Sequence, residues 1–153
     1  MENQLKTSKL SDSIATSELI LPNGYSAKVK VVKIHDGDTC HVHVIYNNHI
    51  CRFVCRLAGI DTPEIGMPNS LIARDYLTHL CIGGAEGNFD KAVARLTETQ
   101  LQNKLDENKF LIVATFNGRG FYNRALVTLQ RAENSVKSFN TMLMEKGLAK
   151  KYQ

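Results

Sequence analysis

The sequence predicts a single α+β domain, mainly β, in which five short strands close into a small barrel with two or three helices packed on it. The chain has 153 residues, of which 43% are hydrophobic, enough for one sizeable core but too few residues for two ordinary domains. Runs typical of β-strands dominate residues 28–57 and return at 109–129. Helical periodicity is confined to the stretches between and after these runs, so the βαβ alternation of a parallel sheet is missing.

Residues 1–26 differ in composition from the rest of the chain. They are rich in Ser, Thr and charged residues and end at Pro22-Asn23-Gly24, which is a turn signal. We therefore expect a flexible N-terminal arm over residues 1–26 and a folded domain over 27–153. The start of the chain lacks a continuous apolar run, so neither a signal peptide nor a membrane span is predicted. We expect a monomeric, intracellular (cytoplasmic) protein without a membrane partner.

The first three predicted strands cover residues 28–34, 39–46 and 49–57, and Asn47-Asn48 is a two-residue hairpin turn between the last two. In this antiparallel register, the numbers of paired positions sum to 95. One face is apolar and should belong to the core: Cys40, Val42, Val44, Tyr46, Cys51, Phe53 and Cys55. The opposite face carries Thr39, His41, His43, Arg52 and Arg56. The register therefore pairs Arg56 with Thr39, one residue from Asp38.

Helices are predicted after Pro63. Ser70 is a candidate cap for a helix over 70–80, and a longer helix is predicted over about 89–105. A last helix begins near residue 139, with Gly147 as its stop signal. Apolar residues at helical spacing define the second and third of these helices: Phe89, Val93, Leu96, Phe139, Met142 and Leu143.

Two further strands complete the barrel. They are predicted over residues 109–116 and 122–129. Asn117-Gly118 is a strong turn signal between them, so the two strands should be antiparallel neighbours.

Four cysteines and two strand histidines raise the possibility of disulfides or zinc. Without a leader, buried reduced thiols are the simpler interpretation, although Cys40 faces Cys55 in the predicted register and that pair is open to oxidation. His41 and His43 lie two apart on one strand face. No Cys-x-x-Cys or His-x-x-x-His motif accompanies them, so we predict solvent-facing side chains here rather than a zinc site.

Two acidic segments follow predicted strands. Asp36-Gly37-Asp38-Thr39 separates the first two strands, and Asp61-Thr62-Pro63-Glu64 follows the third, so both can lie at one rim of the barrel. Carboxylate and carbonyl oxygens are hard ligands that favour Ca²⁺, or less well Mg²⁺, over zinc. Taken alone, the first segment is equally compatible with a solvated turn and the second with a helix N-cap.

Arg56 and Arg124 supply the charge that a phosphodiester requires. A guanidinium matches the extra negative charge of the crowded phosphorus centre through paired hydrogen bonds. Glu64 could accept a proton from an attacking water or simply orient it, and the sequence leaves both roles open. Arg119 is a nearby rival to Arg124 for the second guanidinium. The net charge, 19 − 15 = +4, is compatible with a polyanionic substrate.

In order along the chain, these residues resemble the staphylococcal nuclease (thermonuclease) family. The resemblance covers roughly residues 27–150, and its motifs are moderately specific one by one but strong as an ordered set. The matching segments are Val32 to Thr39, Arg56 to Glu64, Tyr122-Asn123-Arg124-Ala125-Leu126, Asn140 and Gly147-Leu148-Ala149.

The resemblance implies a five-stranded oligonucleotide-binding (OB) barrel and Ca²⁺-dependent cleavage of DNA and RNA, single-stranded or locally unpaired, that leaves a 3′-phosphate. By position, it implies metal ligands at Asp38, Asp61 and the Thr62 carbonyl. It further implies that Glu64 activates water, that Arg56 and Arg124 clamp the phosphate, and that Tyr122 touches a substrate phosphate. The resemblance thus implies a role for seven residues: Asp38, Arg56, Asp61, Thr62, Glu64, Tyr122 and Arg124.

The sequence departs from the family pattern at several places. The segment from 66 to 87 is longer than expected and the loop between 116 and 122 is shorter, which puts the preferred substrate length in doubt. Asn123 replaces the usual Gly, which Asn tolerates in a left-handed conformation. The chain ends at Gln153, so the family's C-terminal helix is expected to be missing, and Tyr152 is one place away from a base-stacking tyrosine, so that role is not transferred to it.

Two other function classes compete with an active nuclease. One is a nucleic-acid-binding OB barrel that has lost catalysis, against which the intact acidic and basic residues argue. The other is a structural module that binds protein partners, which would need an exposed apolar patch that the sequence does not clearly contain.

Overall fold

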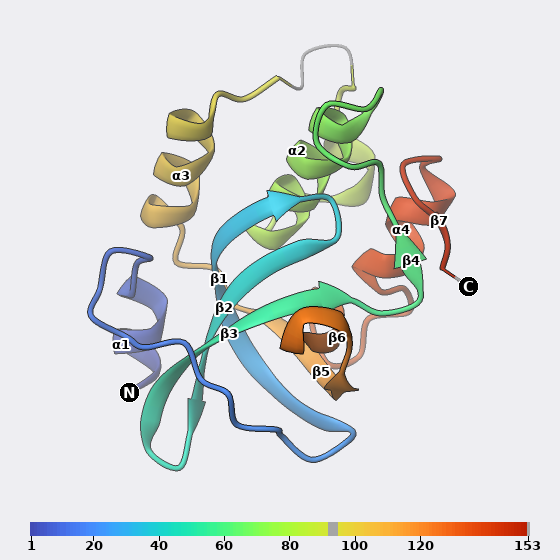
Figure 1. The fold of residues 1–153 in the computed structure, drawn as a ribbon. Coiled ribbons are helices and arrows are strands. Elements are labelled where there is room, and N and C mark those ends of the chain that lie inside the picture. Colours follow the sequence, from blue (N-terminus) through green and yellow to red (C-terminus); the bar gives the residue numbers. More distant parts are fainter. Residues whose placement is uncertain (92–94, 153) are drawn as a thin grey trace.

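A computed structural model of the chain describes residues 1–91 and 95–152. Five strands form a closed barrel in the order β1-β2-β3-β6-β5, with helices on its outside (Figure 1). The barrel strands are β1 (Tyr25–Asp36), β2 (Thr39–Tyr46), β3 (His49–Leu57), β5 (Ile112–Arg119) and β6 (Ala125–Gln130). Together with the helices this is an α+β architecture of OB-like type, which confirms the predicted fold class.

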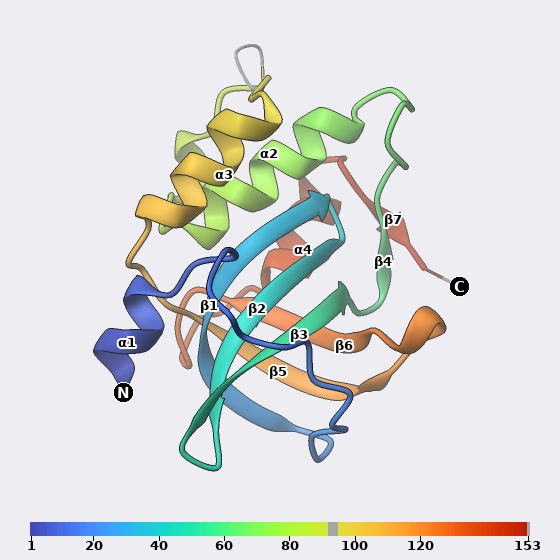
Figure 2. The same cartoon turned by 60° about the vertical axis from the view of Figure 1, so that its left-hand side comes forward.

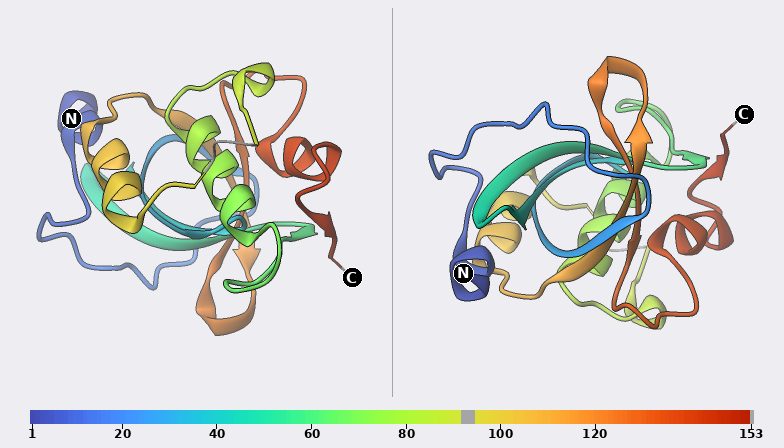
Figure 3. Two further views of the ribbon diagram at one scale, coloured as in Figure 1. Left: turned by 90° about the horizontal axis from the view of Figure 1, so that it is seen from above. Right: turned by 90° about the horizontal axis from the view of Figure 1, so that it is seen from below.

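The helices cover two sides of the barrel. They are α1 (Glu2–Thr7), α2 (Ser70–Cys81), α3 (Glu98–Glu107) and α4 (Phe139–Glu145), with short 3-10 turns η1 (Glu86–Asn88) and η2 (Phe121–Asn123). Seen from above, α2 and α3 lie across one mouth of the barrel (Figure 3). A small second sheet pairs β4 (Ile60–Asp61) with β7 (Lys150–Lys151). No helix among the described residues is both long enough and apolar enough to cross a membrane.

The β2–β3 hairpin has the predicted turn and register. Asn47 and Asn48 have φ values of 50° and 64°, the left-handed conformations that a two-residue turn of this hand requires. Every cross-strand pair from Thr39 and Arg56 to Tyr46 and His49 sums to 95. The barrel closes where β3 and β6 pair in parallel over residues 55–57 and 125–127. The register prediction is therefore confirmed.

The interior of the barrel is filled by the predicted apolar face. Val42, Val44 and Phe53 are almost completely buried, and the Phe53 ring lies 5.6 Å from that of Phe116 on β5. Helix α2 closes the end of this core with a second set of buried side chains: Ala73, Tyr76, Leu77, Leu80 and Cys81. All four cysteines are free thiols, including the facing pair Cys40 and Cys55.

The predicted helix over 89–105 is wrong at its start. Helix α3 begins only at Glu98, because Thr97 forms a capping box with Gln100: each side chain bonds the other residue's backbone N–H. The ring of Phe89 instead packs against that of Tyr76, with 5.0 Å between the two ring centres. Its apolar character therefore reflects packing on α2 rather than helix formation. Val93 lies outside the described residues. The start of α2 also differs, because Asn69 occupies the N-cap position, without a side-chain capping bond, and Ser70 is the first helical residue.

The last predicted barrel strand, which is β6, starts later than predicted. Strand β5 continues through Gly118 to Arg119, and the chain then turns through η2 before β6 begins at Ala125. Tyr122 and Asn123 have φ values of 59° and 60°, so Tyr122 lies in a turn and not in a strand. The left-handed conformation expected at Asn123 is confirmed.

Helix α4 holds the β3–β6 junction in place. The Asn140 side chain accepts a hydrogen bond from the Leu129 N–H at 3.1 Å and donates to the carbonyls of Ala58 and Val127. After the helix, Gly147 adopts a φ of 76°, and the N–H of the next residue bonds back into the last helical turn. The predicted stop at Gly147 is confirmed.

The N-terminal segment has more structure than an arm of its composition suggests. It begins with α1, whose Leu5 side chain is only 1% exposed against the barrel. It then crosses the outside of the sheet and bonds to β2 and β3 through Ser8 and Ser17. The helix and these contacts were not predicted, and the flexibility of residues 1–26 stays a prediction.

Candidate active site

The two acidic segments lie against each other at one rim of the barrel. The Thr62 N–H donates a hydrogen bond of 3.0 Å to the Asp38 carboxylate, which joins the loop after β4 to the β1–β2 turn. Gly37 makes this approach possible, because a Cβ atom there would lie 2.9 Å from the Thr62 side chain and 2.8 Å from the Ala73 Cβ. A residue without a side chain is therefore required at the point of contact.

Arg56 lies between the carboxylates of the two segments. Its Nη1 is 2.6 Å from Asp38 Oδ2, and its Nη2 is 3.2 Å from Asp61 Oδ1 and 3.1 Å from the Ile60 carbonyl oxygen. The position follows from the hairpin register, which places Arg56 opposite Thr39. The prediction that the register brings Arg56 beside Asp38 is confirmed.

Two carboxylates share the β1–β2 turn and have different pKa values. Burial, together with the hydrogen bond and negative charge of Asp38, raises the pKa of Asp36 to about 6. Burial acts in the same upward direction on Asp38, but hydrogen bonds from Asp36, the Thr62 N–H and Arg56 outweigh it and lower the Asp38 pKa. Asp38 therefore loses its proton at a lower pH than Asp36, and negative charge is crowded at this rim.

Arg124 reaches the same place from the end of the η2 turn, directly before β6. Its Nη1 donates to Thr39 Oγ1 at 3.3 Å, and its Nε donates to the Phe121 carbonyl at 3.1 Å. The guanidinium carbon lies 5.6 Å from the centre of the Tyr122 ring, which is 92% exposed. The rival Arg119 instead donates to the backbone carbonyls of Leu19 and Asn123. Of these two arginines, Arg124 lines the cavity described next.

An open cavity of about 730 Å³ brings together all seven residues that the sequence predicts for the site: Asp38, Arg56, Asp61, Thr62, Glu64, Tyr122 and Arg124. Six other residues lie in the lining without a predicted role: His35, Asp36, Thr39, Ile65, Phe121 and Tyr152. Asp36 belongs to the acidic motif itself, so its inclusion was visible in the sequence. Tyr152 arrives through the β4–β7 pairing, with its ring centre 5.2 Å from the Arg56 guanidinium carbon, and no local sequence signal indicates this contact.

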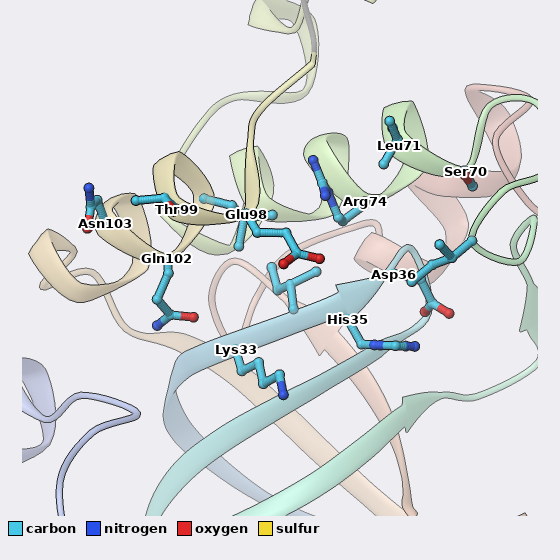
Figure 4. A pocket seen from close by; sticks show the side chains of 13 residues that line it. Lys33, His35, Asp36, Ser70, Leu71, Arg74, Glu98, Thr99, Gln102 and Asn103 are labelled. Carbon is cyan, nitrogen blue, oxygen red and sulfur yellow. The ribbon is translucent and has the colours of Figure 1, made fainter.

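Among the cavities that adjoin this one, two lie on opposite sides of it. The first, of about 440 Å³, has a mostly apolar lining and shares Arg56, Phe121 and Tyr152 with it. The second, of about 570 Å³, lies on the other side of Asp36, between β1 and helices α2 and α3. There the α3 side chains Glu98 and Gln102 point down toward β1 (Figure 4).

The donors at the rim suit a hard cation. Asp36, Asp38 and Asp61 present carboxylate oxygens to one cavity, and the buried Thr62 Oγ1 has no hydrogen-bond partner among the described residues. Oxygen donors with this much negative charge fit Ca²⁺ and, less well, Mg²⁺. No three His, Cys, Asp or Glu side chains in the described part of the chain are already arranged as a metal cage. Arg56 separates Asp38 from Asp61, so a cation bound to both carboxylates would replace that ion pair.

The strand histidines do not have the predicted surroundings. His43 is fully buried beneath the N-terminal segment rather than solvent-facing. Its Nδ1 is 2.8 Å from Ser8 Oγ, and its Nε2 accepts a hydrogen bond from Arg52 Nε at 2.9 Å. Both ring nitrogens are therefore engaged, which leaves none for zinc. The sequence could not reveal this, because the covering residues lie 35 positions away.

No family model matches the chain, and no curated protein shows a significant match to it. The resemblance to staphylococcal nuclease consequently rests on the ordered motifs.

Proposed function

We propose that this protein is a Ca²⁺-dependent nuclease of the staphylococcal nuclease type, which hydrolyses phosphodiester bonds in DNA, RNA or both. The observation that carries the proposal is the convergence of two guanidinium groups, Arg56 and Arg124, at Thr39 beside the Asp38 carboxylate. Opposite charges gathered in one open cavity match a substrate that is an anion and a cofactor that is a cation.

In the proposed reaction, a water oxygen bonds to phosphorus, the bond from phosphorus to the 5′-oxygen breaks, and a proton reaches that oxygen. The products are a 3′-phosphate and a 5′-hydroxyl. Arg56 and Arg124 donate hydrogen bonds to the phosphoryl oxygens, whose negative charge grows as the fifth bond forms. Glu64 is exposed on the loop after β4 and lines the same cavity, where it either accepts the water's proton or orients the water.

A bound Ca²⁺ would neutralise the crowded carboxylates and polarise the phosphate. Asp38, Asp61 and the Thr62 carbonyl are the residues that would hold it. The exposed rings of Phe121 and Tyr152 flank the adjoining apolar cavity, whose size and lining suit a nucleobase next to the attacked phosphate. Stacking on rings favours bases that are not paired, so single-stranded or locally unpaired substrates are favoured.

The rival proposal is binding without cleavage, which an OB-like barrel alone would support. One experiment separates the two. Purified protein is incubated with single-stranded DNA, double-stranded DNA and RNA, each with Ca²⁺ or with a chelator. We expect cleavage only with Ca²⁺, and 5′-hydroxyl ends that a polynucleotide kinase labels without prior phosphatase treatment. Binding to any of these substrates without cleavage would leave the rival standing and exclude the nuclease.

A further inference from the structure

Three polar side chains form a straight row across the outer face of the sheet. Lys30 on β1 pairs with His43 on β2, and His43 pairs with Arg52 on β3. Since side chains of paired residues point to the same face, all three project from the barrel together. We call Lys30, His43 and Arg52 the cross-strand row. Lys30 and His43 are both 0% exposed, although each lies on the outside of the barrel.

The cover over this row is the N-terminal strap, defined as residues 1–22. The strap starts at α1, which packs against β1 and β2, and runs across the front of the sheet toward the β5–β6 hairpin (Figures 1 and 2). Arg52 Nη2 donates to the Leu10 carbonyl, and the Ser17 N–H donates to the Arg52 carbonyl at 2.7 Å. Leu5 and Leu21 are buried, whereas most residues between 9 and 20 are exposed. The strap is therefore held at a few points with little packing between them.

A directed chain of hydrogen bonds links the strap to the row. Arg52 Nε can only donate, so His43 Nε2 must accept, and the proton of a neutral ring lies on His43 Nδ1. That proton is donated to Ser8 Oγ, whose own hydroxyl donates to the Leu5 carbonyl at 2.8 Å. Ser8 thus couples the end of α1 to His43 of the sheet.

Lys30 differs from His43 and Arg52 in its side-chain hydrogen bonding. Its Nζ is buried and has no hydrogen-bond partner among the described residues. Burial lowers the pKa of Lys30, and the carboxylates of Asp106 on α3 and Asp12 on the strap oppose this shift only in part. A buried amine without a partner costs free energy in the free protein. The same amine has three donors for an anion that reaches this face.

The row lies on the path that leads away from the candidate active site. Residues 39, 41 and 43 of β2 share one face, as do 56, 54 and 52 of β3, so the row is two rungs from the Thr39–Arg56 pair. Four residues of strand span about 13 Å. An OB barrel commonly engages ~4–16 nucleotides, so a strand held at the active site is long enough to reach the row. The strap itself brings carboxylates to this face, with Glu2 at 3.3 Å from Lys28 Nζ and Asp12 near Lys30.

We propose that the cross-strand row is a second binding surface for the phosphate backbone of a single-stranded nucleic acid, and that the N-terminal strap occupies this surface until the strand displaces it. The identity of the ligand rests on the proposed function, whereas the burial of the cross-strand row under the strap is observed independently of it. Short substrates that fill only the active-site cavity leave the strap in place. Longer strands must compete with it, so the strap lowers the affinity for long substrates selectively.

Lys30→Met gives the sharpest test, because Lys30 has no side-chain hydrogen bond to lose within the described part of the chain. We measure binding of a fluorescent 12-nucleotide single-stranded DNA by anisotropy in chelator, which prevents Ca²⁺-dependent cleavage, over a range of salt. The variant should unfold at the same or a higher denaturant concentration, yet bind about tenfold more weakly. Its slope of log affinity against log salt should fall by about 0.7, the loss of one phosphate contact. Lys137→Met, an exposed lysine paired with Glu86 and Glu145, is the matched control and should change neither quantity.

The unmodified protein provides an independent measurement. Hydrogen–deuterium exchange with and without the same DNA in chelator should show faster exchange of strap residues 5–17 and slower exchange of residues 39–56. Ser8→Ala, which cuts the link to His43, should tighten binding of the 12-nucleotide strand by about threefold to tenfold and leave binding of a dinucleotide unchanged. Strap amides that keep their protection on DNA binding, or a Lys30→Met variant with wild-type affinity and salt slope, would overturn the inference. Because binding is read in chelator, a protein that binds through Lys30 but never cleaves refutes only the proposed function.

Discussion

Acidification should destabilise this protein through His43. Burial and the positive charge of Arg52 lower the pKa of His43 from 6.5 to about 4. In the unfolded chain the ring takes up a proton near pH 6.5, so between pH 6.5 and 4 the unfolded state binds more protons than the folded state. Stability must therefore fall as the pH falls through this window. A shift of this size corresponds to about 3 kcal/mol once the pH reaches 4.

The geometry gives the same sign. A protonated His43 would carry a hydrogen on Nε2, where Arg52 Nε already points its own hydrogen, so the Arg52–His43–Ser8 chain breaks. The other groups that face the ring are Asp12 on the strap, which favours protonation, and Lys30 and His41, which oppose it. His41 has a pKa lowered to about 4 as well, chiefly by burial, and adds to the fall in the same window.

The measurement is the free energy of unfolding in urea at half-unit steps from pH 7 to pH 4, for the wild type and for His43→Gln. Glutamine keeps an acceptor for Arg52 and a donor for Ser8 but does not titrate. Below pH 6.5 the wild type should lose stability faster than the variant, by up to about 1.4 kcal/mol per pH unit. The contribution of His41 is common to both proteins and cancels in the difference. Parallel curves from pH 6.5 to 4 would refute the neutral, doubly bonded His43.

Three other substitutions test the site and its supports. Arg124→Ala should lower turnover by about 10²–10³-fold. Arg119→Ala should lower turnover far less, because the Arg119 guanidinium is bonded to backbone carbonyls outside the cavity. Equal losses of turnover would remove the distinction between the two arginines. Gly37→Ala should cost about 1–3 kcal/mol in urea unfolding, since its new Cβ would lie 2.8 Å from a neighbouring methyl carbon, and an unchanged midpoint would show that the loops can separate freely. Asn140→Ala should cost about 1–3 kcal/mol by leaving the buried Leu129 N–H unpaired, and wild-type stability would mean that this N–H finds another acceptor.

The sequence predicts the part of the site that local rules determine. Asn47-Asn48 determines the turn, the turn determines the register, and the register alone brings Arg56 to Asp38. Each step depends on residues that are adjacent in sequence or paired by a known rule. The same reasoning covers Thr62, because it follows Asp61 in a segment that must return to the rim.

The features that sequence reasoning missed are contacts between segments that lie far apart in the sequence. Such contacts do not produce a periodic sequence pattern. The strap covers His43 through Ser8, and Tyr152 reaches Arg56 through a two-residue sheet. Neither contact leaves a repeating pattern. The error at α3 has a different origin: Phe89 is apolar because it packs on Tyr76, and helical spacing to Leu96 is then coincidental. Apolar residues at helical spacing indicate burial. They indicate a helix only where a capping residue such as Thr97 is also present.

The position of Arg56 leads to a last prediction, which concerns the order of events in the proposed reaction. In the free protein this guanidinium neutralises Asp38 and Asp61, and its bonds to Asp38 raise its own pKa despite burial. If those carboxylates are the Ca²⁺ ligands, Arg56 competes with the cation. Removing it with Arg56→Ala should therefore tighten Ca²⁺ binding, by about tenfold or 1.4 kcal/mol, even though turnover is lost.

Isothermal titration with Ca²⁺ in the absence of nucleic acid measures this directly. Arg124→Ala is the matched control, because its guanidinium bonds Thr39 and not a carboxylate, and its Ca²⁺ affinity should change much less. Tighter binding in Arg56→Ala alone would mean that Arg56 and Ca²⁺ compete for the same carboxylates. In the proposed reaction, a phosphate that binds Arg56 would then free these carboxylates for Ca²⁺, and Ca²⁺ would free Arg56 for the phosphate. Equal Ca²⁺ affinity in the wild type and Arg56→Ala would show that the cation does not use the carboxylates that Arg56 holds, and the ligand assignment of Asp38 and Asp61 would fall.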